Sequence, residues 1–457
     1  MHNEMDSEYI LQEARKMCAK DYQEEIKENG ILSPSKNKSP LWPPWSTLEY
    51  EAMERDTAKY FLYYGAINMA LKDILTSQKT KKSIKVLVLG PGRGRLVEYV
   101  IDCMKNNNII GVVHVIDAND SCLKLIRERY SDVSRVIVHK ALVIRDCDET
   151  KKLIKGAKAD DELRKLLQDK LIDLIVSELF GSFGDNEFMP EILSVAMRLF
   201  CNEGCISIPQ IYVNYITPVY SVTLDSFFNK IEEESGILEN VYITGLPIDT
   251  ILLSEAKELY SNECVTVCKT MDEKVTFQIG KKFKHIHGFD PEGPNKGGQM
   301  SCDNAEKRSW NGVDISGFLG HFKAVLYKDF YIDTRPGPYR NTYFWESSFF
   351  PLNWESKIKL NEYMKHSICD KDETGLNSFS NTAKFKEKNR ELQFKLQRIL
   401  KKLPHRKRTM DGTVKPPNCD AASPSLEVWY EWSVLNTDGD LLGDIHNSGG
   451  KFHKLHL

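Results

Sequence analysis

Two acidic residues near the middle of the chain could act together on one planar cation. The stretch SELFGSFGDNE, residues 177–187, places Glu178 directly after an apolar run and Glu187 nine positions later. Gly181 and Gly184 lie between them and allow the chain to turn tightly. Two carboxylates on the arms of such a loop can converge on a guanidinium group, whose forked N–H donors pair with carboxylates in bidentate fashion. On this stretch alone, the alternative that both acids are solvated side chains of a polar loop stays open.

Upstream of this loop, the sequence has the pattern of a nucleotide-cofactor site. An apolar strand at 84–89 leads into GPGRG at 90–94, a helix follows at 95–105, and Asp117 ends the next strand. Such glycines let the backbone approach a ligand closely, and an acid at the tip of the second strand accepts hydrogen bonds from ribose hydroxyls. The spacing of 23 positions from Gly94 to Asp117 is close to the ~20 typical of this pattern.

The residue that follows the last glycine separates two classes of cofactor. In the G-x-G-x-x-G pattern of NAD and FAD enzymes, the third glycine allows close packing of the helix. Here Arg95 holds that position, and its large side chain does not suit such packing. S-adenosylmethionine enzymes more often carry the shorter G-x-G-x-G. We therefore expect S-adenosylmethionine, and an NAD-dependent oxidoreductase is the disfavoured alternative.

The order of the predicted elements indicates an α/β domain followed by a mainly β domain. Strands alternate with helices between residues 84 and 209, which is typical of a parallel sheet with helices on both faces. Beyond 209, short strands with turn signals replace this alternation and favour a barrel or a sandwich. We expect these strands at residues 212–217, 265–268, 275–279, 318–327 and 429–434.

The chain therefore divides into three parts. They are an N-terminal helix with a Pro-rich linker at 1–46, a cofactor-binding domain at 47–209 that opens with a helix at 47–77, and a β domain for substrate binding and dimerisation at 210–457. Two insertions interrupt the β domain, a Gly-rich one at about 285–312 and a charged one at 366–424 that we expect to be disordered. Within the second, KKLPHRKR at 401–408 is either a nuclear-import or nucleic-acid patch or a solvated charge run.

Composition excludes several classes of protein. The 457 residues carry a net charge of −3, which argues against a chain-wide nucleic-acid binder. No apolar run approaches the ~20 residues that span a bilayer, and the N-terminus lacks the apolar core of a signal peptide.

The 11 scattered cysteines indicate reduced thiols and a cytoplasmic location, and a nuclear location also stays open. Two C-x-x-x-C pairs, Cys201/Cys205 and Cys264/Cys268, lie far apart, so we expect packing rather than a zinc site.

A set of longer motifs is spread along the chain: YEAMERD, VLVLGPGRGRLV, VIDAND, LIVSELFGSFGDNEFMPEIL, GCISIP, GFLGHFKAVLYKD, FFPL and WYEWSV with IHNSGG. Together they resemble the catalytic region of the protein arginine N-methyltransferase 5 family, the symmetric (type II) protein arginine methyltransferases. The match covers roughly residues 40–352 and 425–457. The two-glutamate stretch is its most specific part, because asymmetric enzymes carry a different sequence there. The resemblance implies a Rossmann methyltransferase domain followed by a β-barrel domain, with S-adenosyl-L-methionine as cofactor.

The resemblance also implies roles for individual residues. Glu178 and Glu187 match the paired glutamates that grip the substrate guanidinium, and we expect them to be catalytic. Met53 and Trp345 are expected to contact the substrate, Trp345 by closing over the arginine. For Tyr60, core packing is the alternative. The expected cofactor-binding residues are Tyr50, Lys59, Tyr60, Gly90, Gly92, Arg93, Asp117 and Glu178.

Several positions depart from the family pattern. Met53 stands where symmetric enzymes have phenylalanine and asymmetric ones have methionine, so the expected symmetric product stays open to monomethyl and asymmetric alternatives. Asp117 replaces a glutamate, and Ala141 with Leu142 aligns with an Asp-Met pair at the adenine. Phe344 and Glu346 flank Trp345 with residue types that the family does not use.

The resemblance carries expectations about partners as well. It implies protein substrates with arginine in a Gly-Arg context, such as histones and spliceosomal-type proteins, and a homo-oligomer. The family's N-terminal TIM-barrel-like domain has no counterpart here, so we do not expect its WD-repeat partner, and the chain is either a fragment or a divergent form. No metal and no membrane partner are expected. A catalytically weak or inactive methyltransferase-like scaffold is the main alternative, because Ala141, the insertions and the missing domain all depart from the enzymes.

Overall fold

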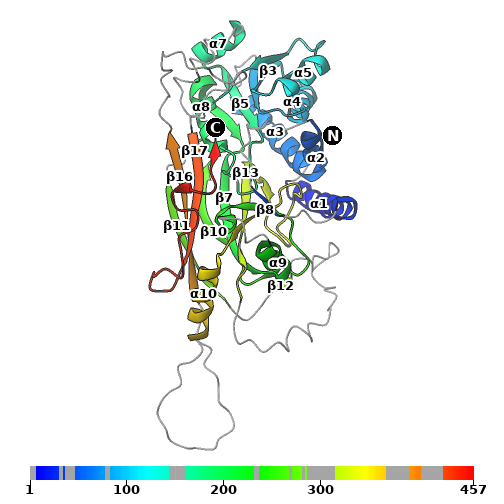
Figure 1. The fold of residues 1–457 in the computed structure, drawn as a ribbon. Coiled ribbons are helices and arrows are strands. Elements are labelled where there is room, and N and C mark those ends of the chain that lie inside the picture. The colour runs from blue at the N-terminus through cyan, green and yellow to red at the C-terminus, as the bar shows by residue number, and fades with distance from the viewer. Residues whose placement is uncertain are drawn as a thin grey trace, which may run out of the picture.

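The molecule has an α/β part and a β-rich part that extends away from it (Figure 1). The computed structural model describes residues 7–29, 34–36, 47–77, 83–143, 150, 161–230, 236–266, 270–279, 284–285, 314–366, 391–402 and 426–456.

A parallel sheet of five strands forms the centre of the α/β part. Its strands are β2 (Ile84–Leu89), β3 (Gly111–Asp117), β4 (Val136–Lys140), β5 (Ile172–Ser177) and β6 (Cys201–Ile208), in the order β4-β3-β2-β5-β6. β5 is buried along its whole length and β2 at all but one position. Burial on both faces explains why these strands are largely apolar in sequence. The order reverses between β2 and β5, and ligands of open α/β sheets bind at the carboxyl ends of strands at such a point.

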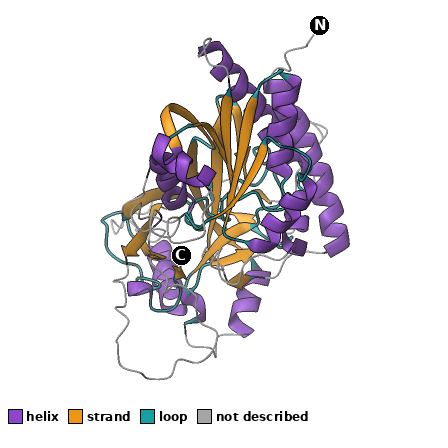
Figure 2. Ribbon diagram, turned by 90° about the horizontal axis from the view of Figure 1, so that it is seen from above, coloured by secondary structure: helices purple, strands orange, loops and turns teal. Residues whose placement is uncertain are grey.

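Helices cover both faces of this sheet, as the view from above shows (Figure 2). They are α3 (Thr57–Ser77), α4 (Arg95–Asn106), α5 (Asp120–Arg129), α7 (Asp161–Asp169) and α8 (Met189–Phe200). α4 packs on β2 and β3, α5 on β3 and β4, and α8 on β6. The N-terminal helix α1 (Ser7–Asn29) packs on α3. The alternation expected at 84–209 is therefore present.

The single helix expected at 47–77 is two helices, α2 (Thr47–Glu54) and α3, with a break at Arg55 and Asp56. The Asp56 side chain explains the break, because its Oδ1 accepts a hydrogen bond of 3.0 Å from the backbone N–H of Lys59. A carboxylate in this position caps the first turn of a new helix. The break lets α2 run in a different direction from α3.

The β-rich part consists of two antiparallel sheets. The larger contains β1 (Ser35–Lys36), β7 (Ile211–Tyr220), β8 (Tyr242–Thr244), β9 (Ile251–Leu252), β10 (Lys257–Glu263), β12 (Lys284–His285), β13 (Gly317–Tyr327), β14 (Phe330–Asp333) and β15 (Ser347–Pro351). The smaller contains β11 (Met271–Gln278), β16 (Glu391–Lys402), β17 (Leu426–Leu435) and β18 (Leu455–His456). Aromatic side chains join the two sheets, with the rings of Phe318 and Phe394 4.4 Å apart.

Three expectations for this part need correction. The strand expected at 265–268 is wrong in its described portion, where residues 264–266 form a turn after β10 and Thr266 N donates to Glu263 O. Two helices, α9 (Val222–Lys230) and α10 (Trp354–His366), lie among strands where we expected none. The insertion at 366–424 contains β16, so disorder is the wrong expectation for 391–402. Alternate residues of β16 are buried, and pairing with both β11 and β17 stabilises it.

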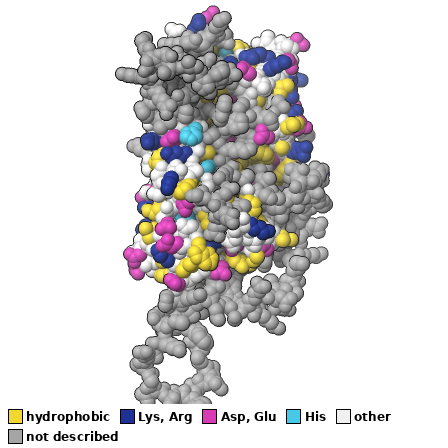
Figure 3. Space-filling model, viewed as in Figure 1, with side chains coloured by type: hydrophobic (Ala, Val, Ile, Leu, Met, Phe, Trp, Pro, Cys, Tyr) yellow, Lys and Arg dark blue, Asp and Glu magenta, His cyan; other side chains and the backbone are white. Residues whose placement is uncertain are grey.

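Basic and acidic side chains of the described residues are interspersed on the face shown in Figure 3. No described helix combines the length and apolar character needed to cross a bilayer. Cys201 is buried, with its Sγ 3.1 Å from that of Cys205, which agrees with packing. Among the described residues, no cluster of histidine, cysteine and acidic side chains could hold a metal ion. Cys268, residues 286–313 and the basic run at 403–408 lie outside the described residues.

Candidate active site

The glycine loop connects β2 to α4 at the carboxyl edge of the parallel sheet. Gly90, Gly92 and Gly94 have φ angles of +67°, +53° and +100°, a region that side chains with a Cβ disfavour. A Cβ at Gly92 would lie 3.0 Å from the ring of Tyr50, so α2 rests directly on the loop. Arg93 holds α2 in this place, because its Nη1 lies 3.2 Å from a carboxylate oxygen of Glu51. The loop and α2 are therefore packed together, and we refer to them as the candidate cofactor cradle.

Asp117 lies beside this cradle, at the end of β3. Its Oδ1 accepts a hydrogen bond of 2.8 Å from Asn119 N. Burial raises the pKa of Asp117 to about 6, because a desolvated carboxylate favours its protonated form. Burial is the main reason that the pKa of the Tyr50 hydroxyl is raised, and the nearby charge of Asp117 raises it further. Ala141, the first residue after β4, donates its backbone N–H to Asp117 O.

The loop between the two glutamates is closed by its own backbone. Gly181 and Gly184 exchange hydrogen bonds of 3.2 and 2.9 Å, and the Asn186 side chain accepts one of 2.8 Å from Phe183 N. Gly184 has a φ of +64°, and a Cβ there would lie 2.6 Å from Asn214 Oδ1 on β7. A Cβ at Gly181 would lie 2.3 Å from Asn186 Oδ1. Both glycines are therefore required by close contacts, and the loop has one compact shape.

Glu178 follows β5 directly and pairs with a buried cation. Its Oε2 lies 3.3 Å from Lys59 Nζ on α3, and its Oε1 accepts a bond of 3.3 Å from Phe180 N. Lys59 is fully buried, and its ammonium lies 4.7, 5.0 and 4.8 Å from the ring centres of Tyr60, Phe344 and Trp345. Burial opposes its charge, yet the pKa of Lys59 lies above its ordinary value because Tyr60, Glu178 and Asp56 favour the ammonium form. A full positive charge thus lies beside Glu178.

Glu187, at the other arm of the loop, has a very different environment. Burial raises its pKa to about 8, and the nearby charge of Glu178 adds to the rise. Two carboxylates that share one site cannot both ionise easily. The next residue, Phe188, is buried and has a φ of +64°. A left-handed backbone at a bulky residue costs roughly 1–2 kcal/mol, and such strain clusters at functional sites.

Trp345 is fixed over the loop by three groups. Its indole N–H donates a hydrogen bond of 3.0 Å to Phe180 O. The segment before it is held by Asp56, which accepts from Thr342 Oγ1 and, at 2.9 and 3.0 Å, from the backbone N–H groups of the next two residues. Arg340 donates to the carbonyls of residues 342, 343 and 345 from the other side. Asp56 and Arg340 were not among the predicted site residues, and no local pattern marks them.

The predicted residues therefore fall into two groups. In the first group, the ammonium of Lys59 contacts Tyr60, Glu178 and Trp345. Glu187 belongs with them because the charge of Glu178 raises its pKa further. The second group lies at the glycine loop: Gly90, Gly92 and Arg93 are part of the loop, and Tyr50 and Asp117 lie beside it. Met53 lies on α2, half-buried and one helical turn beyond Tyr50.

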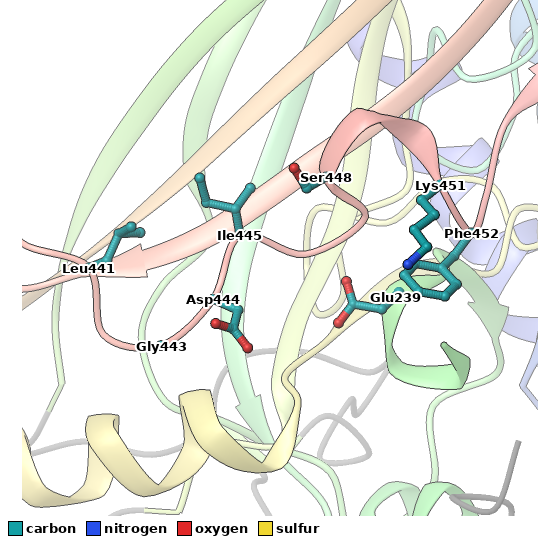
Figure 4. Close-up of a pocket in the computed structure, with 8 residues that line it drawn as sticks. All are labelled: Glu239, Leu441, Gly443, Asp444, Ile445, Ser448, Lys451 and Phe452. Atoms are coloured by element: carbon teal, nitrogen blue, oxygen red, sulfur yellow. The ribbon is translucent and has the colours of Figure 1, made fainter. Parts of the chain in front are cut away.

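A separate pocket lies in the β-rich part, with a volume of about 510 Å³ (Figure 4). It is lined by Glu239, Leu441, Gly443, Asp444, Ile445, Ser448, Lys451 and Phe452. None of these residues belongs to the predicted site. The buried charges at the sheet edge, rather than this open pocket, form the candidate active site, because perturbed pKa values cluster at functional sites.

Comparisons with known proteins show which sequences and structures this chain resembles. Residues 31–208 match the family model described as PRMT5 arginine-N-methyltransferase. Protein arginine N-methyltransferase 5 of Drosophila melanogaster is 30% identical over 428 residues, which cover 92% of this chain and 53% of that protein. The enzyme of the same name from Oryza sativa subsp. indica is 28% identical over 329 residues, which cover 69% of this chain and 43% of that protein. The chain spans about half the length of these curated relatives.

The fold has a counterpart among solved structures. A chain of the Trypanosoma brucei PRMT1 enzyme-prozyme heterotetrameric complex with AdoHcy superposes with a TM-score of 0.51. The alignment covers 89% of this chain and 97% of that chain, at 12% sequence identity. The likeness confirms the expected fold class, a Rossmann-type α/β domain followed by a β-rich domain.

Proposed function

Because residues 31–208 match the PRMT5 arginine-N-methyltransferase model, we propose that this chain is an S-adenosylmethionine-dependent protein arginine N-methyltransferase of that family. The observation that carries the proposal is the loop of residues 178–187. One of its carboxylates pairs with the buried ammonium of Lys59, burial raises the pKa of the other, and Trp345 donates a hydrogen bond to the backbone between them. A planar guanidinium with forked donors matches such a pair better than a lysine ammonium does.

The two carboxylates would have separate tasks. Glu178, paired with Lys59, orients the guanidinium. Glu187, whose pKa burial raises, ionises when the cation arrives and concentrates positive charge on one terminal nitrogen. The other nitrogen is then free to attack a methyl group in line. A guanidinium has a pKa above about 12, so its proton leaves late and no strong base is needed. Positioning and fixed charge in a desolvated pocket supply the rate enhancement.

The cradle suits the proposed cofactor. The close approach of Tyr50 to Gly92 and the carboxylate of Asp117 at the end of β3 offer an aromatic face and an acceptor for ribose hydroxyls. Lys59 offers a cation for a carboxylate. When bound, S-adenosylmethionine supplies an electrophilic methyl on a sulfonium. Arg93 would keep α2 closed over the cradle through its pairing with Glu51.

The finer aspects of function are part of the same proposal. The family match favours symmetric dimethylation, and Met53 favours testing for monomethyl and asymmetric products as well. Gly-Arg-rich proteins, histones and spliceosomal-type proteins are the proposed substrates. A homo-oligomer and a cytoplasmic or nuclear location are also proposed.

A second candidate function is a methyltransferase-like scaffold without catalysis. Ala141 favours it, because the family has an acid for the adenine at the aligned position. Cofactor binding by the Asp117 cradle would then be weak or absent.

The decisive experiment incubates the chain with S-adenosylmethionine and a Gly-Arg-rich peptide, and resolves the acid hydrolysate into monomethyl, symmetric and asymmetric dimethylarginine. Methylarginine from the wild type and none from Glu187→Gln would support the enzyme. Methyl transfer at the wild-type rate by Glu187→Gln would refute the assigned role. Failure of the wild type to bind S-adenosylmethionine would favour the scaffold.

A further inference from the structure

Arg398, on β16, lies 211 positions after Glu187 in the sequence but contacts the segment on both sides of it. Its side chain is fully buried. On one side, Nη2 donates 3.1 Å to the carbonyl of Asp185, and Nε lies 3.2 Å from the Asp185 carboxylate. On the other, Nη1 and Nη2 donate 3.0 and 3.2 Å to the carboxylate of Glu191, in the first turn of α8.

The Asp185 carboxylate is surrounded by further donors from the β-rich part. Tyr430 on β17 donates at 2.7 Å, Tyr212 on β7 at 3.0 Å and Tyr260 on β10 at 3.2 Å. Asp185 itself has no exposed surface. Strands of both antiparallel sheets therefore converge on one carboxylate that is only two residues from Glu187.

This arrangement needs the planar fork of an arginine. One guanidinium reaches a carbonyl and two carboxylates at once, in directions fixed by its plane. A lysine has a single ammonium on a flexible stem and cannot span these partners. Burying two carboxylates with one guanidinium costs solvation energy, and such buried ion pairs are weak evidence for stability. A role in geometry accounts for the network better than a role in stability.

We propose that Arg398 is a positioning residue for the reaction, which fixes Glu187 by clamping Asp185 before it and Glu191 after it. The β-rich part would then set the geometry of the carboxylate that binds the guanidinium. The inference rests on the proposed function of Glu187. It explains how Phe188 is kept in a left-handed conformation, because both ends of the turn are tied to the same side chain.

The test compares Arg398→Lys with the wild type and with a matched control, Arg335→Lys. Arg335 also forms a forked pair, with Asp333, but does not contact the loop of the two glutamates. We expect Arg398→Lys to lower kcat about 100-fold, since small misplacements of a reacting group have effects of this order. Its dissociation constant for S-adenosylmethionine should stay near the wild-type value, because Asp185 and Glu191, to which Arg398 bonds, are not residues of the cofactor cradle. The control should keep kcat.

A second readout separates positioning from folding. In Arg398→Lys, the midpoint of the pH dependence of arginine-peptide binding should move below that of the wild type, because a loosened loop hydrates Glu187. A general loss of structure would instead weaken cofactor binding and kcat together. Should Arg398→Lys fail to fold, Tyr430→Phe removes one donor to Asp185 and keeps the ring, and we expect kcat to fall about fivefold for a lost hydrogen bond of about 1 kcal/mol.

The outcomes are distinct. A folded Arg398→Lys, or in its place Tyr430→Phe, with wild-type kcat would overturn the inference. So would a parallel loss of kcat and cofactor affinity. Methyl transfer at the wild-type rate by Glu187→Gln would overturn the role proposed for Glu187, and the inference with it. An inactive Glu187→Gln together with a fully active Arg398→Lys would overturn the inference alone.

Discussion

The raised pKa of Glu187 makes the affinity for arginine depend on pH. With a pKa of about 8, the carboxyl is ionised in about one tenth of molecules at pH 7 and in about nine tenths at pH 9. A guanidinium binds the ionised form. We therefore expect the affinity of the cofactor-free chain for a Gly-Arg peptide to fall about tenfold for each pH unit below 8 and to level off above 9.

The assay is fluorescence anisotropy with a labelled peptide between pH 6 and 10. The substrate guanidinium does not titrate in this range, so the profile reports on the protein. Glu187→Gln is the control and should bind weakly with no midpoint near pH 8. Binding of one peptide at pH 7 should also release nearly one proton, which calorimetry in buffers of different ionisation enthalpy detects. An affinity that stays constant from pH 6 to 9 in the wild type would refute the reasoning.

Three further predictions follow from single residues. Glu187→Gln should raise the melting temperature relative to the wild type, by an amount that grows from pH 5 to 8. The reason is that the wild-type carboxyl ionises above about 4.5 in the unfolded state but only near 8 in the folded state, so the wild type loses stability over this range. A difference in melting temperature that stays constant with pH would contradict this. Gly184→Ala should cost more stability in denaturant unfolding than Gly204→Ala, because both have positive φ but only the first has an atom within 2.6 Å of the new Cβ; equal costs would contradict the contact. Lys59→Met should weaken S-adenosylmethionine binding at least tenfold in titration calorimetry, because it removes the buried cation beside Glu178. Unchanged affinity would exclude Lys59 as a cofactor-binding residue.

Much of the α/β part is predictable because local patterns determine it. β2, β3 and β5 are buried parallel strands, so each is a largely apolar run in the sequence. Gly90 follows β2, Asp117 is the last residue of β3, and Glu178 follows β5. Asp117 and Glu178 could therefore be placed at the same sheet edge from sequence. The break between α2 and α3 was missed, since it depends on one side-chain cap by Asp56 inside a continuous helical pattern.

The β-rich part is harder to predict from sequence, because its contacts join residues that are far apart in the chain. β16 alternates buried and partly exposed residues, but charged neighbours mask the pattern and Arg398 occupies an inward position where an apolar residue is expected. Its role depends on Asp185, which is 213 positions away, and on tyrosines from three other strands. The support of Trp345 by Asp56 and Arg340 is equally non-local. Contacts of this kind have no signature in a single sequence.

The central claim is that Glu178 and Glu187 together hold an arginine for methyl transfer. Mass spectrometry after incubation with S-adenosylmethionine tests it directly, with a Gly-Arg peptide, the same peptide with lysine at each arginine, and the Glu178→Gln and Glu187→Gln variants. We predict mass increases of methyl groups on the arginine peptide with the wild type alone. Methylation of the lysine peptide, or of the arginine peptide by either variant at the wild-type rate, would contradict the account.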